Sequence, residues 1–457
     1  MGGFSKLGFL LAALGSSIGL GQIWRFPYMV ADNGGGAFII IFIVLILTIG
    51  ISILMAEMII GNAARKDPVE SYRELDTTKS KKWYLAGFSL FGGIGILCFY
   101  CVVLGWVLYY MLGISWTLPS NATESLEIFN NLLGDPWGWQ LVCFYVIVII
   151  TGFIIYKGVE SGIEKLNFVL MPLLFIIFIG LVIYSATSPY FTTALKYLFE
   201  FKPEAITAKT FVDVVSQIFF SLSIGIGIII AYAASSPKKQ NLFKSSVFIS
   251  IAGVCIALMA GIMIFTVVFQ YTAAHSKEGI EFSGPGLVFK TLPLVFHSMG
   301  FTGKIISFLF FLTLGFAGIT STISLLEPGV MYLVDVTKTK KVKLTRTKST
   351  LLLSLIVAVV GTLVIYSDTT GFKFLNLTFW DWLDFLTSDV ILILGGLAVV
   401  IFVGWVIKKE TLKLYASNSL HGVLFEIWYF LVRYISPIIL VIILYVSIKG
   451  GIMKMIA

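Results

Sequence analysis

Apolar residues occur along this chain in long runs, and the segments between the runs hold most of the charged side chains. Eleven runs can be read, and their length is close to the roughly 20 residues that a helix needs to cross a bilayer, whereas an outer-membrane strand needs only about ten. The predicted spans are residues 7–31, 37–64, 86–112, 138–156, 165–185, 212–234, 245–271, 303–335, 348–366, 386–407 and 424–448. The pattern therefore predicts an all-α integral membrane protein.

Two of these runs contain nearly the same glycine-rich stretch. Residues 17–21 read Ser-Ile-Gly-Leu-Gly, and residues 223–227 read Ser-Ile-Gly-Ile-Gly. Because glycine costs a helix interior about 1 kcal/mol relative to alanine, paired glycines favour a break in each helix. The alternative is that the small residues let continuous helices pack closely. Matching breaks in two related halves are typical of transporters, whose binding site lies between discontinuous helices.

The first ten spans divide into two sets of five, residues 7–185 and 212–407, and each set opens with one of the two stretches. An odd number of spans in each set turns the second set upside down in the membrane, which predicts an inverted repeat. Residues 424–448 form an additional eleventh span, and residues 1–457 are treated as one transmembrane domain.

The composition and the charge distribution refine this prediction. The chain is 58% hydrophobic and 12% charged, whereas about a quarter of the residues in a soluble domain are charged. With the N-terminus inside, the cytoplasmic segments carry 21 Lys and Arg residues and the outer segments carry nine. This bias predicts a multi-pass protein of the plasma (inner) membrane with a cytoplasmic N-terminus and an extracytoplasmic C-terminus. It also accounts for the net charge of +8, so the lipid bilayer is an expected partner and nucleic acid is not.

A break in a membrane helix exposes backbone groups that need partners. The N–H groups after Gly21 lie at the positive end of a half-helix and suit a carboxylate. The carbonyl groups of the half-helices that end near Ser17 and Ser221 suit an ammonium group or a small hard cation. Together they favour an amino acid, bound with Na⁺, as the small-molecule substrate.

Several motifs resemble one transporter family, in the order in which the family carries them. They are Gly-Leu-Gly-Gln-Ile-Trp-Arg-Phe-Pro-Tyr at 19–28, Asn-Gly-Gly-Gly-Ala-Phe at 33–38, Gln-Ile-Phe-Phe-Ser-Leu-Ser at 217–223, Gly-Phe-Ala-Gly-Ile-Thr-Ser at 315–321 and Arg-Tyr-Ile-Ser-Pro at 433–437. These motifs resemble parts of the first, sixth, eighth and eleventh helices of the neurotransmitter:sodium symporters, and eleven spans resemble the bacterial members. The resemblance implies the LeuT-type fold, a 5+5 inverted repeat with discontinuous helices 1 and 6, together with alternating access and Na⁺-driven uptake.

The resemblance also implies a substrate site between the two broken helices. The substrate carboxylate would be bound by the N–H groups of Leu20 and Gly21 and by the hydroxyl of Tyr100. The ammonium group would be bound by the carbonyls of Ser17, Phe220, Ser221 and Ser223. The substrate side chain would contact Ile96, Phe220, Ile226, Ser321 and Leu325. Gly19 stands where monoamine-transporting members carry an aspartate, so the substrate should bring its own carboxylate. The mostly apolar lining favours a neutral, hydrophobic amino acid, because burying an unpaired charge is costly.

Two sodium sites follow from the same resemblance. The second site would be formed by the carbonyls of Gly15, Ile18 and Ala317 and the hydroxyls of Thr320 and Ser321, and it is complete. The first site would be formed by Ser17, Gln22, Ser221 and the substrate carboxylate, but its usual amide or acid on the seventh helix falls on Gly253. We therefore predict that the first site is weakened, remodelled or absent. No chloride is expected, because Ala257 and Phe42 stand at the places of groups that chloride-dependent members use.

Charged residues in the spans predict two gates. The resemblance pairs Arg25 with Asp384 at an outer gate, which closes together with Tyr100 and Phe220. Asp335 matches the acid of the inner gate, but the short N-terminus has no counterpart for the usual Arg and Trp partners, so another residue would have to serve. Glu57, inside the second span, is expected to hydrogen-bond the unwound first helix.

The sequence therefore predicts a secondary transporter and not an enzyme, since it contains no nucleophile–base pair, phosphate-binding loop or metal cluster. The predicted function is Na⁺-coupled symport of a neutral, hydrophobic amino acid, mainly through the second sodium site. Two alternatives stay open: the same fold with proton-coupled or uncoupled exchange, and an amino-acid sensor that binds without transporting. A homodimer is compatible with this interpretation.

Overall fold

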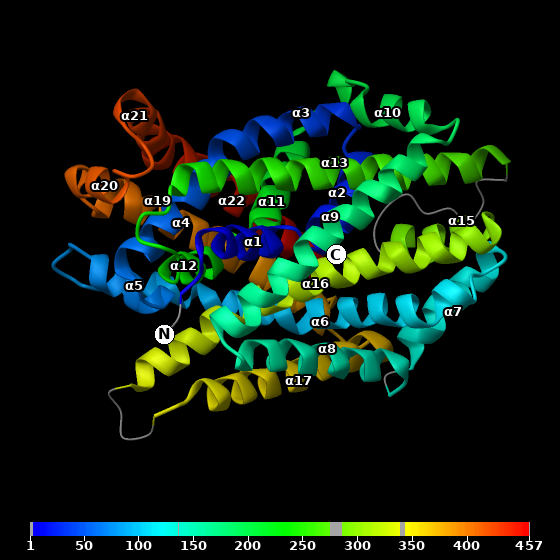
Figure 1. The fold of residues 1–457 in the computed structure, drawn as a ribbon, viewed down its shortest axis with the longest axis horizontal. Coiled ribbons are helices and arrows are strands. Elements are labelled where there is room, and N and C mark those ends of the chain that lie inside the picture. The colour runs from blue at the N-terminus through cyan, green and yellow to red at the C-terminus, as the bar shows by residue number, and fades with distance from the viewer. Residues whose placement is uncertain (1–2, 136, 275–285, 339–342, 457) are drawn as a thin grey trace.

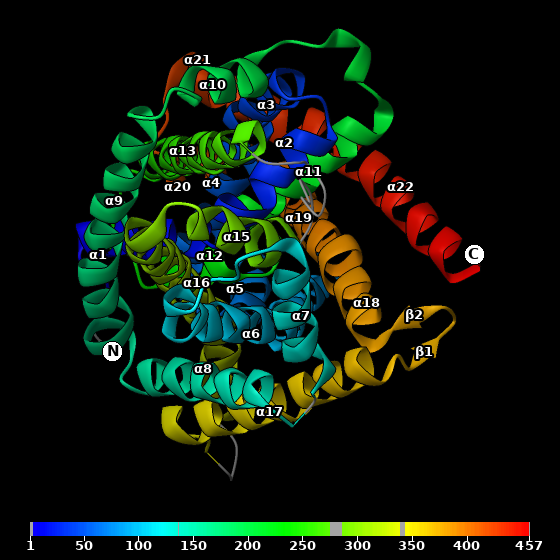
Figure 2. The same cartoon turned by 90° about the vertical axis from the view of Figure 1, so that its right-hand side faces the viewer.

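In a computed structural model, the structure describes residues 3–135, 137–274, 286–338 and 343–456. Several long helices run side by side across Figure 1 and are seen nearly end-on in Figure 2. Within these ranges, nine helices are long and apolar enough to cross a membrane. A bent pair, Lys6–Ser17 with Gly21–Asp32, makes a tenth span when it is counted as one.

Helices occupy all eleven predicted runs. The elements of these runs, in chain order, are α1 (Lys6–Ser17), η1 (Gly21–Arg25) and α2 (Phe26–Asp32); α3 (Gly36–Leu45), η2 (Ile46–Gly50) and α4 (Ile51–Ala64); η3 (Trp83–Ser89) and α6 (Leu90–Leu112); α8 (Trp139–Tyr156); η5 (Val159–Glu164) and α9 (Lys165–Ala186); α11 (Ala208–Leu222) and α12 (Ile228–Ala234); α13 (Leu242–Ala274); α16 (Gly300–Thr337); α17 (Arg346–Thr370); α18 (Phe379–Asp384), η8 (Phe385–Ile391), α19 (Leu392–Ile401) and η9 (Phe402–Val406); and α21 (Gly422–Phe430), η10 (Leu431–Ile435) and α22 (Ser436–Ile456).

Shorter elements connect these helices. They are α5 (Pro68–Leu75), η4 (Ile114–Trp116), α7 (Ala122–Gly134), α10 (Phe191–Phe199), η6 (Pro203–Ala205), η7 (Leu287–Thr291), α15 (Leu292–His297), α20 (Lys409–Tyr415) and an antiparallel hairpin of β1 (Lys373–Phe374) and β2 (Leu377–Thr378). The predicted all-α membrane class is therefore confirmed.

The two glycine-rich stretches interrupt their helices by different amounts. The first break is a bend of 47° around Ile18 and Gly19. The second break leaves residues 223–227 outside any helix, because Ser223, Gly225 and Gly227 have φ angles of 53°, 92° and 75°, a region that favours glycine. The flanking helices α11 and α12 have 15 and 7 residues, too few at about 1.5 Å per residue for either to cross a bilayer core of roughly 30 Å. Both predicted discontinuous helices are confirmed.

The broken helices lie inside the bundle, and apolar helices form its outside. Every residue of α12 is buried, and most of α1 is buried as well. On α8, α9, α17 and α22 the exposed side chains include Ile149, Ile176, Leu355 and Ile438. In Figure 2, α22 lies at the edge of the molecule (red), while α11 and α12 lie near its centre. An apolar outside around a buried, partly non-helical interior is what a bilayer requires, because irregular backbone is tolerated there only inside the protein.

Candidate substrate and cation sites

A small cavity of about 30 Å³ lies at the two helix breaks and is also bordered by α6 and α16. It has room for about two water molecules. Eight of the eleven predicted substrate residues line it: Gly21, Ile96, Tyr100, Phe220, Ser223, Ile226, Ser321 and Leu325. The other three, Ser17, Leu20 and Ser221, are buried but do not line it. Ser16, Gly19, Phe219 and Leu392 complete the wall. No sequence motif pointed to Leu392, which comes from α19 at the far end of the chain.

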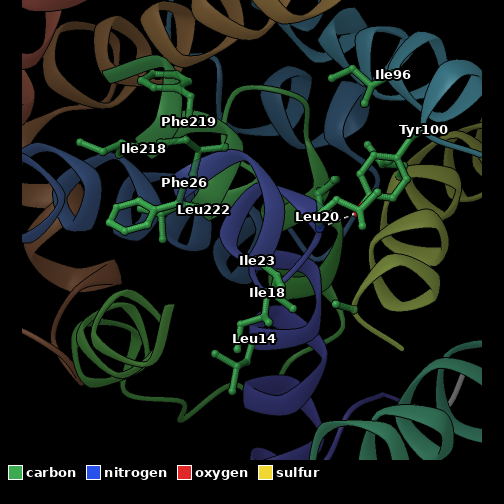
Figure 3. Packing of buried hydrophobic residues seen from close by; sticks show 14 of the residues in the cluster. Leu14, Ile18, Leu20, Ile23, Phe26, Ile96, Tyr100, Ile218, Phe219 and Leu222 are labelled. Carbon is green, nitrogen blue, oxygen red and sulfur yellow. Dashed lines mark hydrogen bonds between the residues drawn. The ribbon is translucent and has the colours of Figure 1, made fainter. Parts of the chain in front are cut away.

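The predicted carboxylate end of this cavity has a hydrogen-bond donor in place. The N–H of Leu20 donates to the hydroxyl oxygen of Tyr100 at 3.0 Å, as the dashed line in Figure 3 shows. A Cβ atom at Gly19 would lie 2.5 Å from Ser321 Oγ and 2.8 Å from Tyr100 Oη. A Cβ atom at Gly21 would lie 2.5 Å from the ring of Phe220. Both glycines are therefore needed for α6, α11 and α16 to approach the first break this closely.

Two side chains tie the first break to the second. Gln217 Nε2 donates to the carbonyl of Gly21 at 2.8 Å and to Ser221 Oγ at 2.9 Å. Ser223 Oγ donates to the carbonyl of Ser16 at 2.8 Å. The two discontinuous helices are thus hydrogen-bonded to each other on both sides of the cavity.

Glu57 supports the second break, and the prediction that it bonds the unwound first helix is wrong. Its Oε1 accepts a hydrogen bond from the N–H of Gly225 at 2.6 Å. The φ of 92° at Gly225 belongs to the longer of the two breaks, where more backbone donors lack a helical partner. The carboxyl is fully buried, and its other oxygen has no partner in the part of the chain that the structure describes.

The residues of the predicted second sodium site come together between α1 and α16. Thr320 Oγ1 lies 2.9 Å from the carbonyl of Gly15 and 3.0 Å from that of Ala317. Ser321 Oγ lies 3.1 Å from the same Ala317 carbonyl. Ile18 ends α1 with a non-helical ψ of 85°, which turns its carbonyl out of the helical direction. Uncharged oxygens from two helices therefore converge within a few ångströms, a donor set that fits a small hard cation.

The predicted first sodium site is built differently, around a single amide. The side chain of Gln22 is fully buried, and neither its oxygen nor its nitrogen has a hydrogen-bond partner among the described residues. A Cβ atom at Gly253 on α13 would lie 2.8 Å from Gln22 Nε2. Gln217 Oε1 is a second buried amide oxygen without a partner in the described ranges. The missing side chain at Gly253 therefore provides the space that the longer Gln22 fills.

The outer-gate residues share one cavity but are not joined in an ion pair. Arg25, Asp384, Tyr100 and Phe220 all line a cavity of about 330 Å³. Arg25 Nη2 donates to Ser216 Oγ at 3.0 Å, and its guanidinium group lies 5.2 Å from the centre of the Phe220 ring. Among the described residues, no ion pair joins Arg25 to Asp384, so the predicted pairing is not present in this conformation.

The same cavity is lined by a second acid, Asp389, which the sequence analysis missed. The π-helical segment η8 carries Asp389 to the cavity that Asp384 also faces. An aspartate inside an apolar span was the available signal.

The acid of the predicted inner gate, Asp335, has a local partner. Asp335 forms an ion pair with Lys338 on its own helix and lines a cavity of about 490 Å³. The N-terminal segment is anchored nearby through Phe4, whose N–H donates to the carbonyl of Ser235 at 2.9 Å and whose ring centre lies 5.4 Å from that of Tyr232 in an edge-on contact.

A half-buried ion pair lines this cavity and was not predicted. Arg346 binds Glu327 with both of its terminal nitrogens, with Nη1 2.9 Å from Oε1, and its Nε donates to the carbonyl of Ile155 at 2.7 Å. The bridge connects α16, α17 and the end of α8.

In the connection between α4 and α5, burial raises the pKa of Asp67 to about 6, and the nearby carboxylate of Asp335 adds to this shift.

Comparisons with known proteins agree with this geometry. The model of the sodium:neurotransmitter symporter family matches residues 4–135 and 131–454. An uncharacterized sodium-dependent transporter of Haemophilus influenzae is 31% identical over 453 residues, which is 96% of each chain. One of Methanocaldococcus jannaschii is 32% identical over 459 residues, 97% of this chain and 89% of that one. The crystal structure of MhsT in complex with L-phenylalanine superposes with a TM-score of 0.87 at 34% identity, over 98% of this chain and 99% of that one.

Proposed function

The chain belongs to the sodium:neurotransmitter symporter family, whose members are transporters and not enzymes, and from this premise we propose that it moves a neutral, hydrophobic amino acid across the membrane together with Na⁺. The observation that carries the proposal is the arrangement around Gly19: the Leu20 N–H meets the Tyr100 hydroxyl beside a glycine whose Cβ has no room. An aspartate at this position would have to displace Ser321 and Tyr100, and the glycine supplies no charge, so the negative charge would come from the substrate. A carboxylate at this point would accept hydrogen bonds from Leu20 and Tyr100.

The rest of the cavity supports an apolar side chain on the substrate. Ile96, Phe220, Ile226 and Leu325 line it, and Ser16, Ser223 and Ser321 add only small hydroxyl groups. Among the described residues that line the wall, Tyr100 alone carries an ionisable group, so a charged substrate side chain would be buried without an opposite charge. The MhsT structure, 34% identical, contains L-phenylalanine, which makes aromatic and branched aliphatic amino acids the first candidates here.

The closed cavity implies that binding and gating are coupled. A volume of about 30 Å³ is too small for any amino acid. Phe220 lies between this cavity and the larger one on the Arg25 side, because it lines both. Substrate entry would displace Phe220, and closure would return it over the substrate, so substrate and Na⁺ would select one gate state over the other.

We propose that Na⁺ couples mainly through the second site. The cation would replace the hydrogen bonds that now join Thr320 to the carbonyls of Gly15 and Ala317. It would thereby hold the bent helix α1 against α16 in the conformation that forms the substrate cavity. Uncharged oxygens suit Na⁺ because no buried carboxylate has to be neutralised.

The first site is proposed to be a remodelled and weaker one. Gln22 would contribute one amide oxygen in the space left by Gly253, with Ser17, Ser221 and the substrate carboxylate as the remaining ligands. An unpartnered buried amide costs about 1–3 kcal/mol, which a bound ion or water would offset. Ala257 and Phe42 are buried and offer no anion ligand, so transport should not need chloride.

This proposal includes the predicted membrane orientation, which follows from the Lys and Arg bias. It also includes the division into two five-span repeats, 7–185 and 212–407, which follows from the two breaks. The N-terminus would lie in the cytoplasm and the C-terminus outside.

A thermal-shift screen of the standard amino acids, each in Na⁺ and in choline buffer, tests the binding part of the proposal. We expect stabilisation by a few neutral, hydrophobic amino acids, in Na⁺ only, because a ligand stabilises the state that binds it. Stabilisation by amines that lack a carboxylate would contradict the carboxylate cradle. Equal stabilisation in choline would favour proton-coupled or uncoupled exchange instead.

A further inference from the structure

Asn167 on α9 has a buried amide oxygen that is aimed at the second sodium site. The residue is 1% exposed, and its Oδ1 has no hydrogen-bond partner within the described residues. Its Nδ2 donates to the carbonyl of Ile163 at 2.8 Å, which fixes which atom faces α1. A Cβ atom at Gly15 would overlap with Asn167 Oδ1 and would lie 3.2 Å from Thr320 Cβ. The amide oxygen therefore lies against Gly15, at a point where Thr320 also approaches α1, and both of these residues provide cation ligands in the proposed site.

No hydrogen-bond donor among the described residues satisfies this oxygen. A buried acceptor without a donor destabilises a protein, and an apolar side chain of the same shape would avoid that cost. The oxygen is also oriented by its own nitrogen and shielded from solvent, so it is prepared for a partner that is absent here. Among small partners, a hard cation is the one whose other ligands are adjacent.

Glu164 continues the line of oxygens toward the predicted cytoplasmic side. Glu164 ends η5, directly before α9, and precedes Asn167 by three residues, so both side chains face α1 from the same side of this continuous helical segment. Each fills a notch that a glycine leaves on α1: Asn167 at Gly15, and Glu164 at Gly8. The side chain of Glu164 is 7% exposed. It accepts from Ser5 N at 3.1 Å and from Ser5 Oγ, both through Oε1.

Glu164 borders a cavity through which an ion could leave the protein. Glu164 and Glu160 line a cavity of about 510 Å³, and Glu160 also lines the neighbouring cavity of about 490 Å³. In Figure 1, α9 crosses in front of α1 and α16 and so runs beside this seam. Oxygen ligands are therefore spaced from the Thr320 region, past Asn167 and Glu164, to the cavities on the side where the N-terminus lies.

We propose that Asn167 and Glu164 form an exit station, a transient cation site at the junction of η5 and α9 that takes Na⁺ as it leaves the second sodium site. This station depends on the second sodium site proposed above. Asn167 Oδ1 would contact the ion first, and the carboxylate of Glu164 would take it next. Since Glu164 now accepts two hydrogen bonds from Ser5, and Ser5 Oγ caps α1 by accepting from Gly8 N, arrival of the ion would loosen the first turn of α1. Ion release and movement of the N-terminal segment would then occur together.

The test compares Asn167→Leu with wild type in two measurements. The first is the Na⁺ concentration for half-maximal amino-acid binding in detergent, and the second is the rate of Na⁺-driven uptake into proteoliposomes. Leucine keeps the shape of asparagine but has no oxygen. We expect uptake to be about tenfold slower, with the half-saturating Na⁺ concentration changed by less than about twofold, because the lost charge–dipole contact is made only during release. Ser185→Ala is the matched control, since Ser185 is also buried on α9 and its hydroxyl, within the part of the chain that the structure describes, bonds only the carbonyl of Leu181 on its own helix; its uptake should equal that of wild type.

Asn167→Asp extends the test and serves if the leucine variant does not fold. A carboxylate beside Gly15 should hold Na⁺ more tightly, lowering the half-saturating concentration about tenfold while slowing uptake. Wild-type uptake by Asn167→Leu, or an unchanged half-saturating concentration in Asn167→Asp, would overturn the exit station. Equal effects of Asn167→Leu on binding and on uptake would make Asn167 a ligand of the second site itself and would also overturn it. Failure of wild-type binding to depend on Na⁺ would instead refute the proposed sodium coupling.

Discussion

The two proposed sodium sites lie close together along the first span, one at the end of α1 and one at η1, yet they are built on opposite principles. At the second site the donor groups are hydrogen-bonded to one another, with Thr320 Oγ1 donating to carbonyls of α1 and α16. At the first site the amide of Gln22 is buried with no partner among the described residues, and Gly253 leaves the space that it occupies. A satisfied set of oxygens can exchange its hydrogen bonds for an ion at small cost, whereas an unpartnered amide depends on an ion, water or substrate to complete it. The difference indicates that coupling strength resides mainly in the second site.

The largest effect is expected from Thr320→Val, which keeps the shape of the side chain and removes the hydroxyl. We expect the half-saturating Na⁺ concentration for amino-acid binding to rise between about tenfold and 100-fold, since a contact to a charged group is lost. Thr313→Val is the control, because Thr313 lies on the same helix and its hydroxyl bonds only the carbonyl of Phe310 among the described residues. Equal Na⁺ dependence of both variants would remove the basis for ranking the second site first.

Gly21→Ala tests the substrate cradle that lies between the two sites. The new Cβ atom would lie 2.5 Å from the Phe220 ring, so either the ring or α1 must move. We expect amino-acid affinity to fall about tenfold, as overpacking of a dense site generally does, and calorimetric titration at saturating Na⁺ would measure it. Gly315→Ala on α16 controls for helix propensity, because nothing lies within 4 Å of its added Cβ. Unchanged affinity in Gly21→Ala would place the carboxylate elsewhere.

A double-mutant cycle on Gln22 and Gly253 tests whether the long amide side chain of Gln22 occupies the space of two shorter side chains, one at each position. Gly253→Ala would crowd Gln22 Nε2 at 2.8 Å, and Gln22→Asn shortens the side chain by one carbon. Each single change is expected to weaken Na⁺-dependent binding about threefold, and the double variant should recover part of that loss, as coupled neighbours do. Strictly additive losses would mean that the two positions do not share one space.

The smallest effect is expected from replacing chloride by gluconate. Ala257 and Phe42 provide no anion ligand, so uptake should be unchanged. A loss of more than about half of the uptake rate would reveal a chloride site that the structure does not explain, and would also change the charge balance at the first sodium site.

Much of the fold and of the central site could be predicted from sequence, because both depend on local patterns. The spans follow from run length, and the breaks follow from glycines at 19, 21, 225 and 227. Tyr100, Phe220 and Ser321 could be placed because the motifs that carry them resemble those of a known family.

The tertiary contacts could not be predicted in this way. Glu57 bonds Gly225 and not the first helix, Asp335 pairs with Lys338, and Arg346 binds Glu327. Asn167 gave no signal at all in the sequence, since its meaning comes from the glycine notch that it fills on another helix. Which side chain meets which depends on helix packing, and hydrophobic periodicity does not encode it.

Uptake of the best-binding amino acid into proteoliposomes tests the central claim most directly. Wild-type protein would be given an inward gradient of Na⁺ or of choline at the same pH on both sides of the membrane. Sodium coupling predicts accumulation above equilibrium with Na⁺ and none with choline. Equal uptake in the two buffers would contradict sodium coupling, and binding without accumulation under any gradient would make the protein a sensor.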